Sequence, residues 1–210
     1  MSIPIPRGVY AITDEALLPT DIFLDRIEAA LKAGISVLQY RNKNGDAALR
    51  QEQCRHLRSL CNHYHTLLLI NDDVELCREV GADGVHLGQS DLQVKGARAA
   101  LGDDAVIGVT CHSSMELAWQ AQQEGASYVA FGRFYPSRTK PHAPPADIQI
   151  LAEARRHLTV PLVAIGGINA ENGAALIEAG ADLLAVIHYL FAFPDIGLRV
   201  TRLNNLFKHT

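Results

Sequence analysis

The sequence lacks the features that mark several large classes of protein. It has 210 residues and a formal net charge of −4, with no block of basic residues that would bind nucleic acid. No apolar run approaches the ~20 residues that span a bilayer, and residues 1–7 lack the charged and then apolar pattern of a signal peptide. We therefore expect a cytoplasmic protein with neither nucleic acid nor membrane as a partner. The sequence leaves the oligomeric state open, a homo-oligomer included.

The sequence also has few cysteines, and their spacing fits neither a disulfide framework nor a metal finger. Cys54, Cys61, Cys77 and Cys111 include no C-x-x-C pair. We expect reduced cysteines that are mostly buried as small hydrophobic residues. Cys111 stands beside His112 after a predicted strand, so a catalytic thiol is the less favoured alternative at that position.

Short runs of β-branched and aliphatic residues recur eight times along the chain. They cover residues 8–13, 36–40, 66–70, 84–87, 106–109, 128–131, 161–165 and 182–187. Segments with helical spacing lie between them, among them 22–32, 47–62, 115–123 and 170–178. Glycine at the helix ends strengthens the repeat, since Gly34, Gly81, Gly125 and Gly180 each stand between a predicted helix and the next strand.

Regular alternation of apolar strands and helices predicts the α/β class, with a parallel sheet covered by helices. Eight such units favour a single (β/α)8 TIM barrel domain over residues 1–210. An open doubly wound sheet is the alternative. It is less favoured because no G-x-G-x-x-G follows the first predicted strand.

Polar residues gather where the predicted strands end, which is the end that carries the active site in barrels of this kind. Gln39, Arg41 and Lys43 are two residues apart, so on an extended strand they would share a face toward the barrel mouth. Asp72 and Asp91 follow adjacent strands and are hard oxygen ligands suited to Mg²⁺.

Other residues at these strand ends allow more than one interpretation. His86 fits either a hydrogen-bonded core histidine or a residue with a direct chemical role, and the first is the more common. Asp73 is predicted to cap the helix that follows the third predicted strand. Ser137, Thr139 and Lys140 form a hydroxyl-rich loop suited to phosphate, although they lack the Walker order. Gly167 belongs to a Gly-Gly pair whose backbone could approach an anion.

Five motifs together resemble the thiamine phosphate synthase family over residues 8–191. They are Gln39-Tyr40-Arg41-Asn42-Lys43, Ile70-Asn71-Asp72-Asp73, Gly84-Val85-His86-Leu87-Gly88-Gln89-Ser90-Asp91, Phe134-Tyr135-Pro136-Ser137-Arg138-Thr139-Lys140 and Ala164-Ile165-Gly166-Gly167-Ile168. The resemblance implies a Mg²⁺-dependent transferase that joins hydroxymethylpyrimidine diphosphate to hydroxyethylthiazole phosphate, or to its carboxylated form. The products would be thiamine phosphate and diphosphate.

The resemblance also implies a role for each matching position. The metal ligands would be Asp72 and Asp91, and the cations that stabilise the departing diphosphate would be Arg41, Lys43 and Lys140. The pyrimidine diphosphate would be bound by Gln39, Arg41, Lys43 and Asn71, and Thr110 would lie near its diphosphate. His86 is a further candidate for substrate binding. The loop residues Ser137, Thr139 and Lys140 would contact both phosphate groups, and Gly167 with the backbone of Val186 and Ile187 would hold the thiazole phosphate.

Two positions depart from the family pattern. Ser137 stands where many members have threonine, which keeps the hydroxyl, and His188 stands where a small or hydroxylated residue is usual. Two other functions remain open on the same barrel. One is a thiazole tautomerase, which would need a proton-transferring histidine, and the other is a non-catalytic barrel that binds thiazole phosphate or thiamine phosphate.

Overall fold

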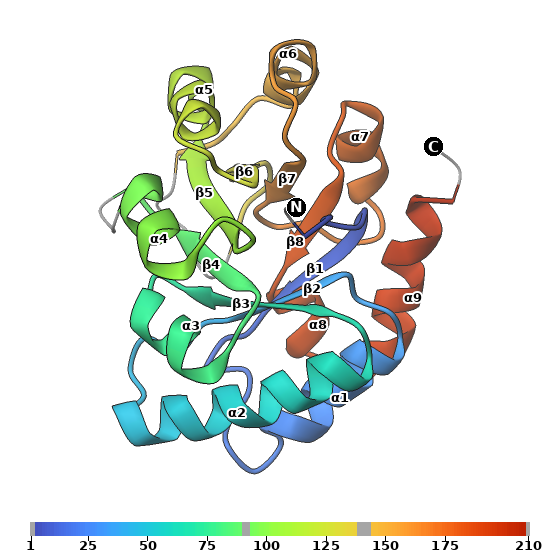
Figure 1. Ribbon diagram of the computed structural model, residues 1–210. Coiled ribbons are helices and arrows are strands. Elements are labelled where there is room, and N and C mark those ends of the chain that lie inside the picture. Colours follow the sequence, from blue (N-terminus) through green and yellow to red (C-terminus); the bar gives the residue numbers. More distant parts are fainter. Residues whose placement is uncertain (1–2, 90–92, 138–143, 209–210) are drawn as a thin grey trace.

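The computed structural model describes residues 3–89, 93–137 and 144–208, and these form a closed parallel barrel surrounded by helices (Figure 1). The strands are β1 Gly8–Ile12, β2 Val37–Tyr40, β3 Leu67–Asn71, β4 Gly84–Leu87, β5 Val106–His112, β6 Tyr128–Phe131, β7 Leu162–Ile165 and β8 Leu183–Val186. They pair in chain order, and β1 pairs in parallel with both β2 and β8. The predicted barrel is therefore confirmed, and the open sheet is excluded.

The helices follow the strands in the order that the sequence predicts. They are α1 Phe23–Lys32, α2 Ala47–His63, α3 Val74–Val80, α4 Val94–Leu101, α5 Met115–Gln123, α6 Gln149–His157, α7 Gly173–Glu178, α8 His188–Phe191 and α9 Ile196–Leu206. Gly81 ends α3 with a φ of 64°, the left-handed conformation that glycine adopts most readily. In the described part of the chain, no helix has both the length and the apolar character needed to cross a membrane.

Two parts of the fold differ from the prediction. Strand β5 continues to His112 instead of ending at 109, and its register against β6 shifts between Thr110 and His112. The chain after β8 forms two helices, α8 and α9, where the eight-fold alternation predicts one helix without a residue range. Helix α9 packs against α1, α7 and β1, so it covers the seam where the barrel closes.

Alternation of side chains along the strands produces two hydrophobic layers. One face of each strand packs against the helices, with residues such as Val9, Leu38 and Ile70 fully buried there. The other face fills the barrel interior, where Tyr10, Val37, Leu69, Val106, Tyr128, Val163, Leu183 and Ala185 pack together. The next inward positions toward the carboxyl ends of several strands are polar, and they form the floor of the mouth.

Candidate active site

A chain of hydrogen bonds crosses the barrel interior just below its mouth. The Gln39 Nε2 atom donates to the Tyr10 hydroxyl at 2.6 Å, and the Tyr10 and Tyr128 hydroxyls lie 2.7 Å apart. The Tyr128 hydroxyl lies 2.8 Å from Nδ1 of His86, whose Nε2 lies 2.8 Å from Oγ1 of Thr110. The five residues come from β2, β1, β6, β4 and β5, so the chain links most of the barrel wall.

Both tyrosines in this chain are almost completely buried, at 2% exposure for Tyr10 and 1% for Tyr128. Burial raises the pKa of each hydroxyl well above its ordinary value, so both remain protonated at neutral pH. Gly108 makes room for this arrangement, because a Cβ at that position would lie 1.9 Å from Cζ of Tyr128. Gln39, His86 and Thr110 were predicted from the sequence. Tyr10 and Tyr128 were missed, although their side chains also lie on the inward faces of their strands.

A cavity of about 350 Å³ opens at the carboxyl ends of β2 and β3. It brings together three residues that the sequence analysis selected, Lys43, Asn71 and Asp72. Asn71 donates from Nδ2 to Oδ2 of Asp72 at 2.6 Å, and Nζ of Lys43 lies 3.8 Å from the same oxygen. A carboxylate, an amide and an ammonium group therefore meet in one hollow.

The backbone has an uncommon conformation at one predicted site residue, Asp72, and at the end of β5. Asp72, directly after β3, has a φ of 63°, and His112, the last residue of β5, has a φ of 52°. A left-handed conformation in residues other than glycine is typical of sites where the backbone aims a side chain for function. The amide of Asp72 is held by the carbonyl of His86 at 2.9 Å, which ties this corner to β4.

The same cavity contains an ion pair that the sequence analysis missed. Arg50 on α2 reaches Asp73, with Nη2 2.6 Å from Oδ2 and both side chains about one third exposed or less. The other oxygen of Asp73 accepts from the backbone N–H of Leu76 at 2.9 Å, so the predicted helix cap is confirmed. Arg50 reaches the cavity because it lies on the face of α2 that is turned toward Asp73. Its position in the sequence does not reveal this contact.

Arg41 and Lys43 lie beyond the end of β2 at Tyr40, so strand alternation does not fix their side chains as it fixes Gln39. The backbone of Arg41 is held by the buried Thr13, whose Oγ1 accepts from the Arg41 N–H at 2.7 Å and donates to its carbonyl at 3.1 Å. Arg41 is half-buried, whereas the Lys43 side chain is 55% exposed. Both cations therefore stand at the rim, and Gln39 alone of the three points into the interior network.

The opposite side of the mouth is built from β6, β7 and β8, and its described residues bring backbone to the mouth at Gly167. Gly167 is exposed with a φ of 65°, and a Cβ there would lie 2.4 Å from the carbonyl oxygen of Pro136. The loop after β7 thus lies directly on the loop after β6, which contains the half-buried Ser137. Val186 is buried at the end of β8, and Ile187 precedes the first turn of α8.

His188, the departure from the family pattern, is the first residue of α8. Its ring is half-buried and packs edge to face on Phe193, with ring centroids 5.9 Å apart. Three other predicted site residues, Asp91, Thr139 and Lys140, lie outside the described residues. No cluster of three or more His, Cys, Asp or Glu side chains suited to a metal occurs among the residues that the structure describes.

The four cysteines are buried and free, as expected. Cys111 is completely buried in the layer between the barrel and the helices, and burial raises the pKa of its thiol to about 12. A thiol that stays protonated at neutral pH is a poor nucleophile. The alternative of a catalytic thiol at Cys111 was therefore wrong.

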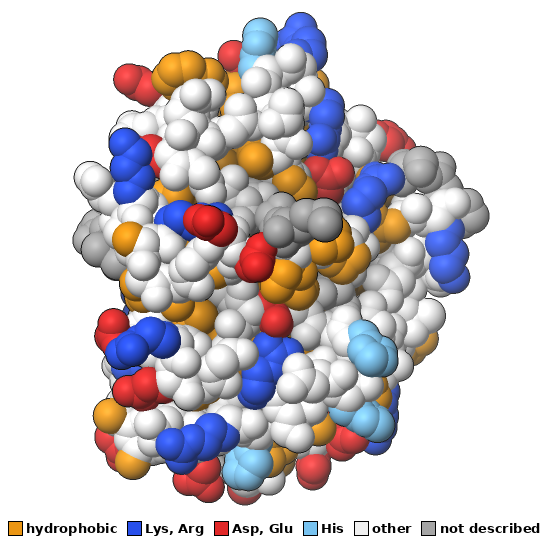
Figure 2. Space-filling model, in the orientation of Figure 1, with side chains coloured by type: hydrophobic (Ala, Val, Ile, Leu, Met, Phe, Trp, Pro, Cys, Tyr) orange, Lys and Arg blue, Asp and Glu red, His pale blue; other side chains and the backbone are white. Residues whose placement is uncertain are grey.

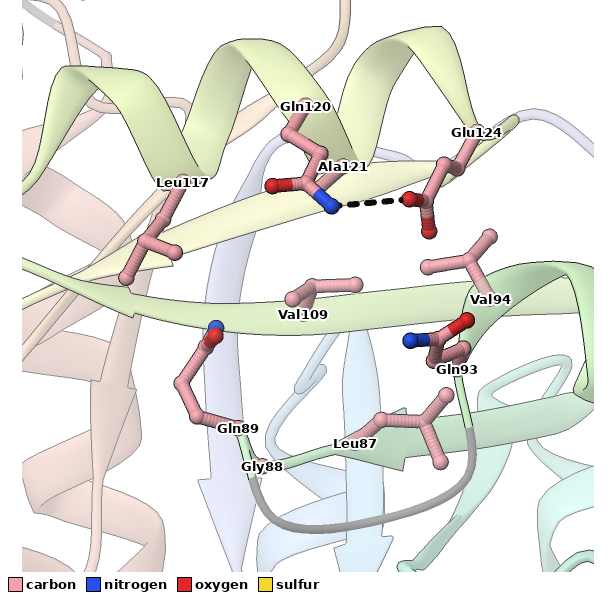
Figure 3. Close-up of a pocket in the computed structure, with 10 residues that line it drawn as sticks. All are labelled: Leu87, Gly88, Gln89, Gln93, Val94, Val109, Leu117, Gln120, Ala121 and Glu124. Carbon is pink, nitrogen blue, oxygen red and sulfur yellow. Dashed lines mark hydrogen bonds between the residues drawn. The ribbon is translucent and has the colours of Figure 1, made fainter.

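A second cavity, of about 110 Å³, lies on the outside of the barrel between α4 and α5 (Figure 3). Aliphatic side chains such as Leu87, Val109 and Leu117 line it together with neutral amides and one carboxylate, and Gln120 donates to Glu124. None of the described residues that line it is cationic. A phosphorylated substrate therefore fits the first cavity better than this one.

Charged side chains are mixed over the face of the molecule drawn in Figure 2, where basic and acidic groups alternate. This agrees with the small net charge of −4. The concentration of polar groups in the barrel mouth is thus a local feature and does not reflect a strongly charged surface on this face.

Comparison with known proteins identifies the family of this chain. Residues 9–190 match the family model described as thiamine monophosphate synthase. The chain is 53% identical over 192 residues to the thiamine-phosphate synthase of Saccharophagus degradans, covering 91% of this chain and 88% of that protein. It is 50% identical over 202 residues to the thiamine-phosphate synthase of Thiobacillus denitrificans, covering 96% and 95%. The solved structure of thiamine phosphate pyrophosphorylase from Pyrococcus furiosus superposes with a TM-score of 0.88 at 29% identity, covering 96% of each chain. By the family match and by these relatives, the chain belongs to the thiamine monophosphate synthase family.

Proposed function

We propose that this chain joins hydroxymethylpyrimidine diphosphate to hydroxyethylthiazole phosphate, or to its carboxylated form, and releases thiamine phosphate and diphosphate. The observation that carries the proposal is the meeting of Lys43, Asn71 and Asp72 in one cavity at the barrel mouth. Family membership supplies the identity of the reaction, and the cavity supplies groups suited to a diphosphate.

The two sides of the mouth suit the two substrates. Gln39, Asn71, His86 and Thr110, with the cations Arg41 and Lys43, would bind the pyrimidine diphosphate. Gly167 and the backbone of Val186 and Ile187 would bind the thiazole phosphate, as glycine-rich turns and helix N-termini commonly bind anions. Ser137, Thr139 and Lys140 would lie between them. The assignment of these roles is supported by the family motifs at the same positions.

The chemistry requires stabilisation of a leaving group and needs no protein nucleophile. The aminopyrimidine can carry positive charge on its exocyclic methylene when the bond to diphosphate breaks, and the thiazole nitrogen then forms the new bond. Arg41, Lys43 and Lys140 would balance the negative charge that grows on the departing diphosphate. The protein would also hold the two substrates in line, which lowers the entropic part of the barrier.

Mg²⁺ is the proposed cofactor, with Asp72 and Asp91 as its ligands, and it would supply further positive charge at the diphosphate. The described residues fit this metal, because the Asp72 carboxylate faces an open cavity and is a hard oxygen donor. Asn71 and Lys43 both approach Oδ2 of Asp72, an arrangement that orients the carboxylate.

The test is mass spectrometry of the purified protein mixed with both substrates and Mg²⁺. We expect thiamine phosphate in amounts that exceed the protein many times over. Isomerisation of a carboxylated thiazole phosphate without the pyrimidine would instead identify a tautomerase. Binding of the phosphates without any turnover would identify a non-catalytic barrel, and either result would overturn the proposal.

Three further expectations accompany the proposed function. We propose that residues 1–210 act as one domain, in keeping with the single barrel. Action in the cytoplasm stays a prediction, supported by the four free cysteines. A homo-oligomer also stays open.

A further inference from the structure

The hydrogen-bond chain across the barrel has a direction, because each hydroxyl in it has only one hydrogen to donate. The Gln39 amide donates to the Tyr10 oxygen, and among the described residues the buried hydrogen of Tyr10 has only the Tyr128 oxygen as an acceptor, so we assign this hydrogen to Tyr128. Tyr128 then donates its own hydrogen to the remaining partner, Nδ1 of His86. The direction is therefore transmitted from one side of the barrel to the other.

The direction decides which nitrogen of His86 carries hydrogen. Since Nδ1 accepts from Tyr128, the hydrogen of a neutral ring sits on Nε2, which donates to Oγ1 of Thr110. The hydroxyl hydrogen of Thr110 then has no other partner among the described residues. Thr110 is half-buried on the inward face of β5 at the mouth, so this hydrogen is available to a bound substrate.

Packing holds the chain in place. The rings of His86 and Tyr128 are stacked at 5.6 Å with an interplanar angle of 22°, and the Tyr10 ring meets Tyr128 edge to face at 6.0 Å. Gly108 accepts the Tyr128 ring in space where a side chain would collide. Because the rings are confined, they cannot rotate as freely as exposed side chains to form new hydrogen bonds when one hydrogen bond of the chain is lost.

We propose that Tyr128 is a positioning residue that, with Tyr10, fixes His86 as the Nε2–H tautomer and so makes Thr110 a hydrogen-bond donor to an oxygen of the diphosphate substrate. The role of Thr110 as a substrate contact rests on the proposed function. Tyr128 itself acts through His86 and Thr110. If donation along the chain ran in the opposite direction, Thr110 would donate to His86. Thr110 would then offer the substrate only an acceptor oxygen, which repels a diphosphate oxygen.

The first test is nitrogen NMR of protein labelled at histidine with ¹⁵N, with His86→Gln used to assign the His86 signals among the nine histidines. We expect wild-type His86 to carry hydrogen on Nε2 and none on Nδ1. Tyr128→Phe should convert it to a mixture of tautomers. Hydrogen on Nδ1 in the wild type, or an unchanged tautomer in Tyr128→Phe, would overturn the proposal.

The second test is a double-mutant cycle on thiamine phosphate formation. Tyr128→Phe and Thr110→Val should each lower kcat/KM for the pyrimidine diphosphate about tenfold, the size of one lost hydrogen bond at about 1.4 kcal/mol per factor of ten. In the Thr110→Val background, Tyr128→Phe should change kcat/KM by less than about twofold. Independent effects that multiply would show that Tyr128 does not act through Thr110.

Controls separate this proposal from folding and from the proposed function. Tyr64→Phe removes a hydroxyl that bonds to Glu28 at the outer surface, and it should leave both measurements unchanged. If Tyr128→Phe fails to fold, Tyr10→Phe keeps Tyr128 but removes the group that directs it, and the same changes should follow at smaller size. A wild-type protein that makes no thiamine phosphate would contradict the proposed function, while the NMR result would still decide the tautomer.

Discussion

The two sides of the barrel mouth present different kinds of chemical group. The side formed by β1 to β5 offers side chains, including the hydrogen-bond chain that ends at Thr110 and the cavity around Asp72. On the side formed by β6 to β8, the described residues offer backbone at Gly167, where the loops after β6 and β7 lie in direct contact. The first side should therefore be sensitive to loss of a functional group, and the second to any added bulk.

The largest effect should follow from removing a cation on the side formed by β1 to β5, which we call the side-chain half. We expect Arg41→Ala to lower kcat/KM by ~10² or more, because a half-buried contact to a leaving diphosphate is worth about 2 to 4 kcal/mol in the transition state. Steady-state kinetics on the folded variant measure this. Arg78→Ala is the control, since Arg78 is exposed on α3 and pairs with Glu75. Equal kinetics for Arg41→Ala and wild type would remove Arg41 from the site.

A smaller but still large effect should follow from adding one methyl group on the side formed by β6 to β8, which we call the backbone half. Gly167→Ala would bring a Cβ to 2.4 Å from the Pro136 carbonyl, so one of the two loops must move. We expect kcat/KM for the thiazole phosphate to fall about 30-fold, the equivalent of about 2 kcal/mol of strain.

Gly81→Ala is a closely matched control for that variant. Gly81 has a φ of 64° against 65° for Gly167, but a Cβ there meets nothing within 4 Å. Both variants should lose about 1 to 2 kcal/mol of stability from the left-handed conformation, which denaturant unfolding measures. Only Gly167→Ala should lose activity, and an equal loss in both would mean that the close approach of the loops has no role in the site.

Mg²⁺ should raise the affinity of the side-chain half for diphosphate by about tenfold and leave phosphate binding on the backbone half almost unchanged. As the proposed metal ligands, Asp72 and Asp91 would supply only two of the six ligands that Mg²⁺ requires, so the free protein should bind it weakly. Diphosphate should raise the affinity for Mg²⁺ about tenfold, and Mg²⁺ should raise that for diphosphate by the same factor. Titration calorimetry of wild type, Asp72→Asn and Asp91→Asn measures this coupling. Inorganic phosphate, as a stand-in for the group bound on the backbone half, should bind with little dependence on Mg²⁺. Tight Mg²⁺ binding without diphosphate would contradict the metal assignment.

The sequence predicts the barrel well because each apolar run is local and the runs repeat. It predicts the end of β5 less well, since Thr110 and His112 are polar residues inside a strand that continues through a register shift. After β8 the alternation predicts one helix where the fold has two, and α9 closes the ring by packing between α7 and α1. Local patterns thus identify the strands, but the way in which the last helix completes the fold depends on contacts distant in sequence.

The candidate site shows the same limit. Lys43, Asn71 and Asp72 were selected from strand ends, and they meet because parallel strands end on one side of the barrel. Tyr10 and Tyr128 were missed because their hydroxyls meet across 118 residues of sequence, and only barrel closure brings them together. Residues that act on a substrate leave a signal at strand ends, whereas residues that position them are found only once the registers of the strands are known.

The smallest effect is expected at His188, which tests whether the backbone half truly depends on backbone. His188 begins α8, and its ring packs on Phe193 at 5.9 Å, so the side chain already has a structural partner. If backbone N–H groups near Ile187 bind the thiazole phosphate, His188→Ser should change its KM by no more than ~10-fold, or ~1.4 kcal/mol. Kinetics with varied thiazole phosphate measure this, and His157→Ser, at an exposed position on α6, is the control. Complete loss of activity in a folded His188→Ser protein would give this histidine a chemical role, and the backbone half would then resemble the side-chain half.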